Sequence, residues 1–338
     1  MPDLGSYIDY RGSILSCHYK YEQAFCKQQA MNQRLFRQVS IRKNLELRAA
    51  IIQAVRTFFL NEGYLEVETP CRIPAPIPEA NIDAELSGSW FLHTSPELYM
   101  KWLLAAGYSR IFQVCRCFRQ KERGKRHLPE FTILEWYCVE SNYLQMMDQS
   151  EELLRFVASR IGLKDLVTYQ GEKIDLKKPW ERITVAEAFD KFASISMKDA
   201  LLNNSFEEIM ALEIEPLLAR ERPLFLYDYP ACDSALTRLK PGSTQIAERF
   251  ELYIAGIELC NASSELTDHN EQKKRFKIER KRRSQLGKEI YPTPDKFLEN
   301  LKSMPNASGN ALGIDRLVML FADTTKIDDV TAFTPEEL

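Results

Sequence analysis

The sequence lacks the features that are typical of membrane, secreted or nucleic-acid-binding chains. None of its apolar runs approaches the roughly 20 residues that cross a bilayer. The first residues, MPDLGSYIDYRGS, do not have the basic-then-apolar pattern of a signal sequence. The net charge is -3 and the isoelectric point is near 6.0, which argues against bulk nucleic-acid binding. Any anion site must therefore be local.

Disulfide and metal patterns are also missing from the sequence. The eight cysteines contain no CxxC pair, and Cys115 and Cys117 stand two apart in an expected strand, too near for tetrahedral zinc pairing. The four histidines are scattered, without the spacing of metal ligands. We therefore expect all eight thiols to be reduced and mostly buried, as in a cytoplasmic protein.

The composition is that of a globular protein with a sizeable core. Of the 338 residues, 45% are apolar and 28% are charged, enough for one large domain or two ordinary ones. Periodicity predicts helices over 45–60, 145–162 and 271–287, strands over 110–120 and 131–139, and a hairpin over 249–261. This order predicts an α+β fold, an antiparallel sheet flanked by helices. We expect an N-terminal extension over 1–40 and a catalytic domain over 41–338, with a possible helical insertion around 165–240.

A strongly basic loop joins the two predicted strands. Glu135 and Tyr137 lie on one face of the second strand, among apolar neighbours, because side chains alternate between faces. Such a pair could hold an ammonium group. The alternative is a structural Glu paired with a core Arg or Lys, which is the commoner role of an isolated strand Glu. The loop itself carries Lys121, Arg123, Lys125, Arg126 and His127.

The hairpin brings two carboxylates together. If Ala255 and Gly256 form its turn, Tyr253 faces Glu258, Glu251 faces Cys260, and both acids share a face. Such acids repel unless a cation such as Mg²⁺ lies between them. The alternative is a pair of solvated charges on the outer face. For Asn261 and Glu265 to join Glu258, the strand needs a bulge near Cys260.

The stretch GNALGIDRLVML enters a helix through glycines. Gly309 and Gly313 allow close approach of the backbone, and Arg316 falls in the first helical turn, where an anion is favoured. The alternative is an ordinary turn with an Asp–Arg pair on the surface. In combination with the basic loop and the acidic hairpin, this segment predicts a site for a metal-bound triphosphate beside a small amine.

These same segments resemble a known family. GYLEVETP, FRQKERGKRHLPEF and GNALGIDR resemble motifs 1, 2 and 3 of class II aminoacyl-tRNA synthetases. TSPELYMK, EFTILEWY and ELCNASSEL are similar to the lysyl type, and the resemblance covers about residues 42–338. Only about forty residues precede motif 1, too few for an anticodon-reading OB-fold barrel. Together with Ala311, where lysyl-tRNA synthetases generally have Gly, this resembles the free-standing paralogues that modify elongation factor P.

The resemblance implies a role for each matching residue. Arg119 and Arg316 are expected to be catalytic, Arg119 on the α-phosphate and substrate carboxylate and Arg316 on the γ-phosphate. Phe131 is expected to stack on adenine and His127 to reach the outer phosphates. The full implied ATP site is Arg119, Glu122, His127, Phe131, Glu258, Leu259, Gly313 and Arg316, with Mg²⁺ on Glu251 and Glu258. The implied substrate site is Ser95, Glu97, Glu135, Tyr137, Asn261, Glu265 and Ala311, in which Glu135, Tyr137 and Glu265 take the side-chain ammonium.

Two positions depart from the lysyl pattern. Motif 2 generally has Glu two residues after its Arg, where this chain has Lys121 followed by Glu122. In addition, Ser263 stands where an aromatic residue lines the lysine chain, which predicts a wider or wetter pocket.

The implied function is AMP-forming activation of lysine or (R)-β-lysine and its transfer to elongation factor P. Lysyl-tRNA synthesis without an anticodon domain and a catalytically silent regulator are the alternatives. The resemblance also implies a homodimer joined through residues 45–70. The cysteines predict a cytoplasmic protein, the lack of long apolar runs predicts no membrane contact, and the missing anticodon domain argues against tRNA as a partner. The basic run KKRFKIERKRR is expected to be a solvated helix face, with an acidic partner or RNA as its alternative ligand.

Overall fold

The computed structural model of the chain describes residues 36–338. The expected N-terminal extension, residues 1–40, therefore lies outside the described residues except for 36–40, which consist of Phe36 and the short helix α2 (Arg37–Ser40).

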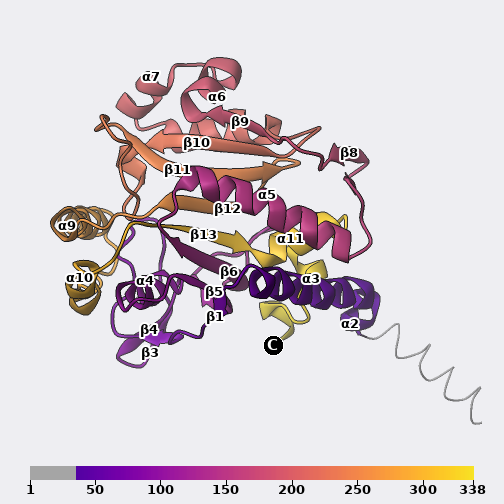
Figure 1. The fold of residues 1–338 in the computed structure, drawn as a ribbon, viewed down its shortest axis with the longest axis horizontal. Coiled ribbons are helices and arrows are strands. Elements are labelled where there is room, and N and C mark those ends of the chain that lie inside the picture. The colour runs from indigo at the N-terminus through magenta and orange to yellow at the C-terminus, as the bar shows by residue number, and fades with distance from the viewer. Residues whose placement is uncertain (1–35) are drawn as a thin grey trace, which may run out of the picture.

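An eight-stranded sheet forms the centre of the molecule (Figure 1). The six middle strands pair antiparallel, as predicted, whereas β1 and β9 add to the two edges in parallel. The α+β prediction is confirmed, and the sheet is mixed at its edges. In spatial order the strands are β1 (Leu65–Glu66), β5 (Arg110–Phe118), β6 (Glu130–Val139), β13 (Ala307–Gly313), β12 (Ile257–Ser264), β11 (Ile246–Ile254), β10 (Leu224–Pro230) and β9 (Glu181–Thr184).

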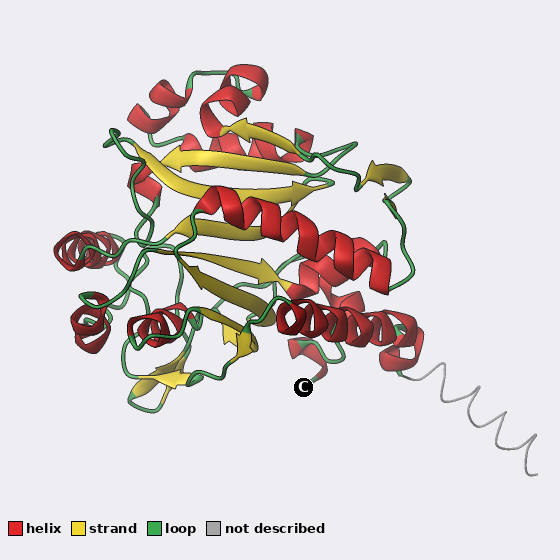
Figure 2. Cartoon of the chain, in the orientation of Figure 1, coloured by secondary structure: helices red, strands yellow, loops and turns green. Residues whose placement is uncertain are grey.

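One face of this sheet packs on the main hydrophobic core. Leu134 and Trp136 of β6 are fully buried there against α3 (Arg42–Asn61), α5 (Tyr143–Arg160) and α11 (Ile314–Phe321). Figure 2 shows α5 crossing this face of the strands. Because side chains alternate along a strand, Ile133, Glu135 and Tyr137 must point to the opposite face. That face carries the polar groups of the site.

Smaller elements close the opposite face and the ends. The short strands β2 (Arg72–Ile73), β3 (Leu86–Ser87) and β4 (Trp90–Leu92) form their own sheet. Next to them, α4 (Glu97–Ala105), α9 (His269–Gln285) and α10 (Asp295–Leu301) lie at one end of the strands (Figure 1). These helices bury Leu104, Phe276 and Leu298 in a second core beside the face that carries the polar groups.

The segment 165–240 is more than the mixture of helix and loop that its sequence suggests. It contains α6 (Val185–Phe192), α7 (Met197–Leu202) and α8 (Phe206–Ile209), followed by a π-helical turn (Met210–Ile214). It also contains the hairpin of β7 (Leu166–Tyr169) and β8 (Glu172–Asp175), and the main-sheet strands β9 and β10. The segment therefore completes the sheet instead of lying outside it.

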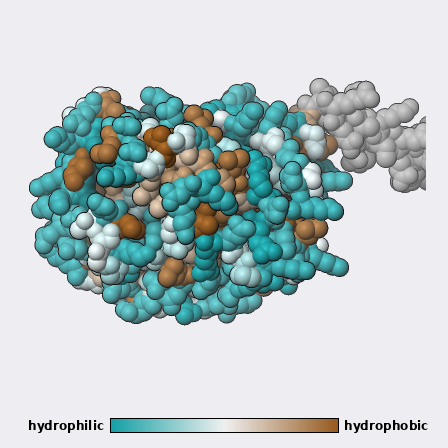
Figure 3. Space-filling model, turned by 90° about the horizontal axis from the view of Figure 1, so that it is seen from above, coloured by the Kyte–Doolittle hydropathy of each residue, from teal (hydrophilic) through white to brown (hydrophobic). Residues whose placement is uncertain are grey.

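The surface and the thiols complete the description. Seen from above, the described surface is largely hydrophilic with scattered apolar side chains (Figure 3). Within residues 36–338, no helix combines the length and apolarity needed to cross a bilayer. The expectation of mostly buried cysteines is wrong for the described ones, because Cys117 and Cys260 are buried but Cys71 and Cys232 are exposed. Cys17 and Cys26 lie outside the described residues.

Candidate active site

The acidic hairpin owes its arrangement to a bulge. Ala255 and Gly256 form the turn with φ of 54° and 68°, and Tyr253 pairs with Glu258 as expected. The register then shifts by one residue, so Glu251 pairs with Asn261. The prediction that Glu251 faces Cys260 is therefore wrong. The shift skips Leu259, next to Cys260, where a bulge was required. It places Asn261 on the same face as Glu251 and Glu258.

This face opens into a cavity of about 690 Å³, large enough for a nucleotide and a small substrate. The cavity lies over β6, β12 and β13 and is walled by α4, the basic loop, α9 and the start of α11. Every predicted site residue except Glu251 lines it: Ser95, Glu97, Arg119, Glu122, His127, Phe131, Glu135, Tyr137, Glu258, Leu259, Asn261, Glu265, Ala311, Gly313 and Arg316.

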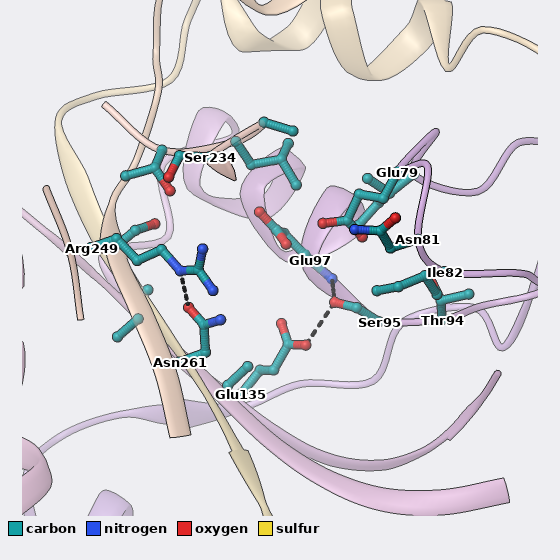
Figure 4. A pocket seen from close by; sticks show the side chains of 18 of the residues that line it. Glu79, Asn81, Ile82, Thr94, Ser95, Glu97, Glu135, Ser234, Arg249 and Asn261 are labelled. Atoms are coloured by element: carbon teal, nitrogen blue, oxygen red, sulfur yellow. Dashed lines mark hydrogen bonds between the residues drawn. The ribbon is translucent and has the colours of Figure 1, made fainter. Parts of the chain in front are cut away.

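Glu135 lies at the acidic end of the cavity and is almost fully buried. The Ser95 hydroxyl donates to its Oε1 at 2.6 Å, and the Tyr137 hydroxyl donates to its Oε2 at 2.8 Å. Figure 4 shows the Glu135 and Glu97 carboxyls facing the same space. Burial, with the nearby charge of Glu97, raises the pKa of Glu135 to about 8. A cation that binds next to such a buried carboxyl stabilises its ionised form and lowers its pKa.

A buried lysine that the sequence reasoning missed lies beside these acids. Lys101 Nζ is 2.5 Å from carboxylate oxygens of both Glu97 and Glu265. Burial by itself would lower the pKa of Lys101, but the charges of Glu265 and Glu97 raise it by a larger amount. The net pKa lies above the ordinary value for lysine, so Lys101 stays charged. Its signal in the sequence is a lysine four residues after Glu97, between the apolar residues Met100 and Trp102 of α4. Lys101 fixes two carboxylates but cannot balance Glu135 as well.

Glu79 adds a further carboxyl that was missed. It comes from the Pro-rich loop after β2 and lines the cavity near Glu97 (Figure 4). Burial and the charge of Glu97 raise its pKa to about 7. No periodic pattern marks a loop residue of this kind, so its position depends entirely on how the loop folds back.

Arg249 is the third missed residue, on β11 across from Ser263. Its Nε donates to Asn261 Oδ1 at 3.1 Å, and its guanidinium contacts Glu251 at 2.6 Å. The guanidinium also lies 4.4 Å from the centre of the Tyr229 ring. Arg249 therefore holds the amide of Asn261 in place at the cavity wall (Figure 4).

The other end of the cavity is cationic. The Arg119 guanidinium lies over the Phe131 ring at 4.9 Å, and its buried Nε has no hydrogen-bond partner among the described residues. Arg316 donates to Glu258 Oε2 at 2.9 Å and to His127 Nε2 at 2.7 Å. Burial and the neighbouring Arg316 charge lower the pKa of His127, so it is a neutral acceptor at pH 7.

The rest of the basic loop divides between the cavity and structural contacts. Lys121, at the departing position, has φ of 65° and is exposed, whereas Glu122 lines the cavity 3.9 Å from Arg119. Arg123 is bound instead to Asp328 and Glu336 near the C-terminus. The loop thus uses part of its charge to hold its own shape.

The two predicted metal ligands differ in their surroundings. Glu258 lines the cavity, and Arg316 lowers its pKa despite burial. Glu251 lies behind it, accepting from Tyr229, Tyr253 and Arg249 at 2.6–2.7 Å. Burial and the charge of Glu258 raise the Glu251 pKa, so a cation at Glu258 would relieve their repulsion. The donor set fits Mg²⁺ bound by Glu258 and phosphate oxygens, with Glu251 as a second carboxylate on the same face.

Gly309 sets the floor of the acidic end. It pairs with Tyr137 on one side and with Ser263 on the other. A Cβ at this position would overlap the Tyr137 ring and the Glu265 carboxylate. Glycine is therefore required for both of these side chains to turn into the cavity.

Comparison with known proteins agrees with this geometry. The family model described as "tRNA synthetases class II (D, K and N)" matches residues 27–337. Elongation factor P–(R)-β-lysine ligase of Vibrio atlanticus (strain LGP32) is 36% identical over 308 residues, covering 86% of this chain and 95% of that protein. The ligases of Enterobacter sp. (strain 638) and Pectobacterium atrosepticum are each 36% identical, covering 86% and 87% of this chain and 94% and 95% of their own lengths. This chain belongs to the class II tRNA synthetase family of the D, K and N type.

Proposed function

We propose that this chain uses ATP to activate lysine or (R)-β-lysine and transfers it to a lysine side chain of elongation factor P. The observation that carries this proposal is the division of one cavity into an acidic end around Glu135 and a cationic end around Arg119 and Arg316. A diamino acid fits the first end and a triphosphate the second. The relatives named as elongation factor P ligases supply the acceptor.

The first proposed step forms the adenylate. A carboxylate oxygen of the amino acid attacks the α-phosphorus of ATP, the bond to the bridging oxygen breaks, and pyrophosphate leaves. The nucleophile is already an anion, so positioning and charge stabilisation suffice. Arg119 would bind the α-phosphate and the attacking carboxylate, while Arg316 and His127 would bind the outer phosphates. Mg²⁺ held by Glu258 would neutralise charge on the phosphates.

The second proposed step transfers the aminoacyl group. The acceptor lysine nitrogen attacks the carbonyl carbon of the mixed anhydride, AMP leaves, and the nitrogen gives up a proton. Glu135, Tyr137 and Glu265 would hold the side-chain ammonium of the substrate throughout. Ser95 and Glu97 would lie near its second amine, with Asn261 toward the carboxylate and Ala311 on the floor. Ser263 lines the cavity, and its small side chain would leave room for an amino acid whose second amine is displaced.

The proposal is tested by intact mass of elongation factor P. The full chain is incubated with ATP, magnesium and either lysine isomer, and the acceptor is weighed. We expect the acceptor to gain the mass of one lysyl residue, and a variant with its acceptor lysine replaced by Arg to gain none. Labelled lysine on total tRNA with unmodified factor would instead indicate a tRNA ligase. Absence of pyrophosphate exchange with either isomer would indicate a silent regulator.

We also propose a homodimer joined through residues 45–70, as the family resemblance implies. Leu60 and Leu65 in this segment are apolar yet at least half exposed, which supports a buried contact there. Sedimentation of the full chain tests it, with Leu60→Glu and Leu65→Glu expected to shift the species toward monomer. We place the reaction in the cytoplasm, where thiols such as Cys71 and Cys138, both free, stay reduced.

A further inference from the structure

A cluster of potential metal ligands lies beside the cavity, next to the strand residues Phe131 and Ile133 that line it. His93, just after β4, meets Cys115 and Cys117 of β5, and their ligand atoms all lie within 4.8 Å of one another. The spacing of Cys115 and Cys117 alone argued against a zinc pair, and the third group, His93, comes from a different element, so the sequence pattern does not reveal the cluster. In a strand, however, residues two apart point to the same side, so both thiols can face one imidazole.

The imidazole of His93 has one nitrogen hydrogen-bonded to the backbone and the other available as a metal ligand. It is fully buried, and its Nε2 lies 2.6 Å from the Arg116 carbonyl oxygen. A carbonyl only accepts, so Nε2 must carry the proton and Nδ1 must carry a lone pair. Nδ1 is buried without a hydrogen-bond partner among the described residues. Burial also lowers the His93 pKa, which keeps the ring neutral. A backbone carbonyl that fixes the tautomer in this way is typical of metal-binding histidines.

The two thiols differ in access. Cys117 is fully buried, and burial together with Cys115 raises its pKa well above that of a free thiol. Cys115 is half-buried, and its neighbour Cys71 is exposed. The pKa of Cys71 is raised, mainly by partial burial of its thiol and to a smaller degree by Cys115. The cluster is thus closed at Cys117 and open at Cys115, which leaves a way in for an ion.

We propose that His93 Nδ1 and the sulfurs of Cys115 and Cys117 bind a thiophilic d¹⁰ cation of the Zn²⁺ class, with the fourth position on the Cys115 side. Ligand atoms of a tetrahedral zinc site lie roughly 3.3–3.8 Å apart, given bonds of about 2.0–2.3 Å. Because the three ligand atoms already lie within 4.8 Å of one another, the side chains would have to bring them closer by at most about 1.5 Å. Binding would release the thiol protons, because zinc takes the thiolate.

An ion bound here would influence the positions of two residues that line the cavity, Ser95 and Arg119. Ser95 follows His93 by two residues, and Arg119 follows Cys117 by two residues. The Phe118 N–H also donates to the His93 carbonyl at 3.0 Å. A bound ion would therefore link the segment that positions Ser95 to the strand that positions Arg119.

Absorption spectroscopy with Co²⁺, followed by Zn²⁺ displacement, tests this site. The full chain is purified under reducing conditions, stripped of metal and titrated as wild type, as Cys115→Ser/Cys117→Ser, and as Cys138→Ser. Cys138 is a matched control, because it is a half-buried strand thiol on β6. We expect wild type and Cys138→Ser to show a thiolate-to-cobalt charge-transfer band, removed by an equivalent of Zn²⁺. The double variant should lose this band.

Several outcomes overturn the proposal. A band of equal size in wild type and the double variant would assign the metal to other residues, such as Cys17 and Cys26. Absence of a band in wild type, or a Cys115–Cys117 disulfide in the reduced preparation, would also contradict it. Should the double variant fail to fold, Cys115→Ala at the half-buried position must still weaken binding at least tenfold. None of these measurements depends on the proposed ligase activity.

Discussion

The two ends of the cavity handle charge in opposite ways. At the cationic end, Arg316 is already paired with Glu258 and hydrogen-bonded to neutral His127. At the acidic end, Lys101 pairs with Glu97 and Glu265 and leaves Glu135 with only hydroxyl donors. The cationic end is therefore organised before its ligand arrives, whereas at the acidic end Glu135 has no cationic hydrogen-bond partner among the described residues until an ammonium binds.

The pKa values follow this division. The pKa of Glu258 is held below its ordinary value by Arg316 in spite of burial, whereas burial raises those of Glu135 to about 8 and Glu265 to about 7. Carboxyls with raised pKa values are protonated in part at neutral pH, and a substrate ammonium shifts them to the charged form. On the proposed assignment, recognition of the substrate at this end would release protons.

The largest expected effect comes from removing the cationic end. Arg119→Ala should lower the rate of ATP–pyrophosphate exchange by about 10²–10³, because charge developing on the α-phosphate loses its donor. Arg116→Ala is the control, since Arg116 is an exposed arginine of β5, three residues before Arg119, and does not line the cavity. Normal exchange in the Arg119 variant would refute the assignment of that end.

Glu135→Gln should break the acidic end while leaving the cationic end intact. The KM for lysine should rise about 10–100-fold, because a charge-assisted contact to the ammonium is worth about 1.5–3 kcal/mol. The KM for ATP should change little. Glu130→Gln, at the exposed start of β6, should leave both unchanged. An unaltered KM for lysine in Glu135→Gln would contradict this role.

The acidic end should also give a characteristic pH dependence. Below pH 8 the carboxyl of Glu135 is largely protonated, so binding an ammonium must displace that proton. The KM for lysine should therefore fall by up to about 50-fold from pH 6 to pH 8, because the ionised fraction of a carboxyl with a pKa of about 8 rises from about 1% to about 50%. The same profile in Glu135→Gln should be flatter. An identical slope in both proteins would show that other groups control it.

The smallest expected effect is on the stability of the ligand-free protein. Between the unfolded pKa of about 4.3 and the folded value of about 8, folding takes up a proton at Glu135, so stability falls as pH rises. Glu135→Gln removes this loss. Urea unfolding at pH 8 should show the variant more stable by about 1–3 kcal/mol, with a smaller difference at pH 5. A variant that is less stable at pH 8 would contradict the raised pKa.

Local sequence patterns predicted much of this architecture. Alternation in β6 and β12 and the Ala255–Gly256 turn were sufficient to place Glu135, Glu258 and Asn261 on one face, once the bulge was included. Family motifs predicted the remaining candidate site residues, and all of these except Glu251 line the cavity. These features are encoded over a few neighbouring residues, where periodicity is a reliable guide.

The missed features depend on contacts between distant segments. The sequence around Lys101 is that of an ordinary helix, and its role follows from the ion pair with Glu265, which lies just after β12. Glu79 lies in a loop, where no periodic pattern indicates which way a side chain points. Glu251 lies on the predicted face, but its carboxylate oxygens accept hydrogen bonds from Tyr229 of β10 and from Arg249, and it does not line the cavity. Strand β10 itself was missed, because it lies in a segment interpreted as helix and loop.

Pyrophosphate exchange with matched amino acids tests the central claim, that one end of the cavity requires a second ammonium. Lysine or (R)-β-lysine is compared with norleucine, which keeps the carboxylate and one amine but lacks the side-chain amine. We predict exchange with a lysine isomer and at least a 100-fold lower specificity constant with norleucine. Comparable exchange with norleucine would contradict the assignment of Glu135, Tyr137 and Glu265.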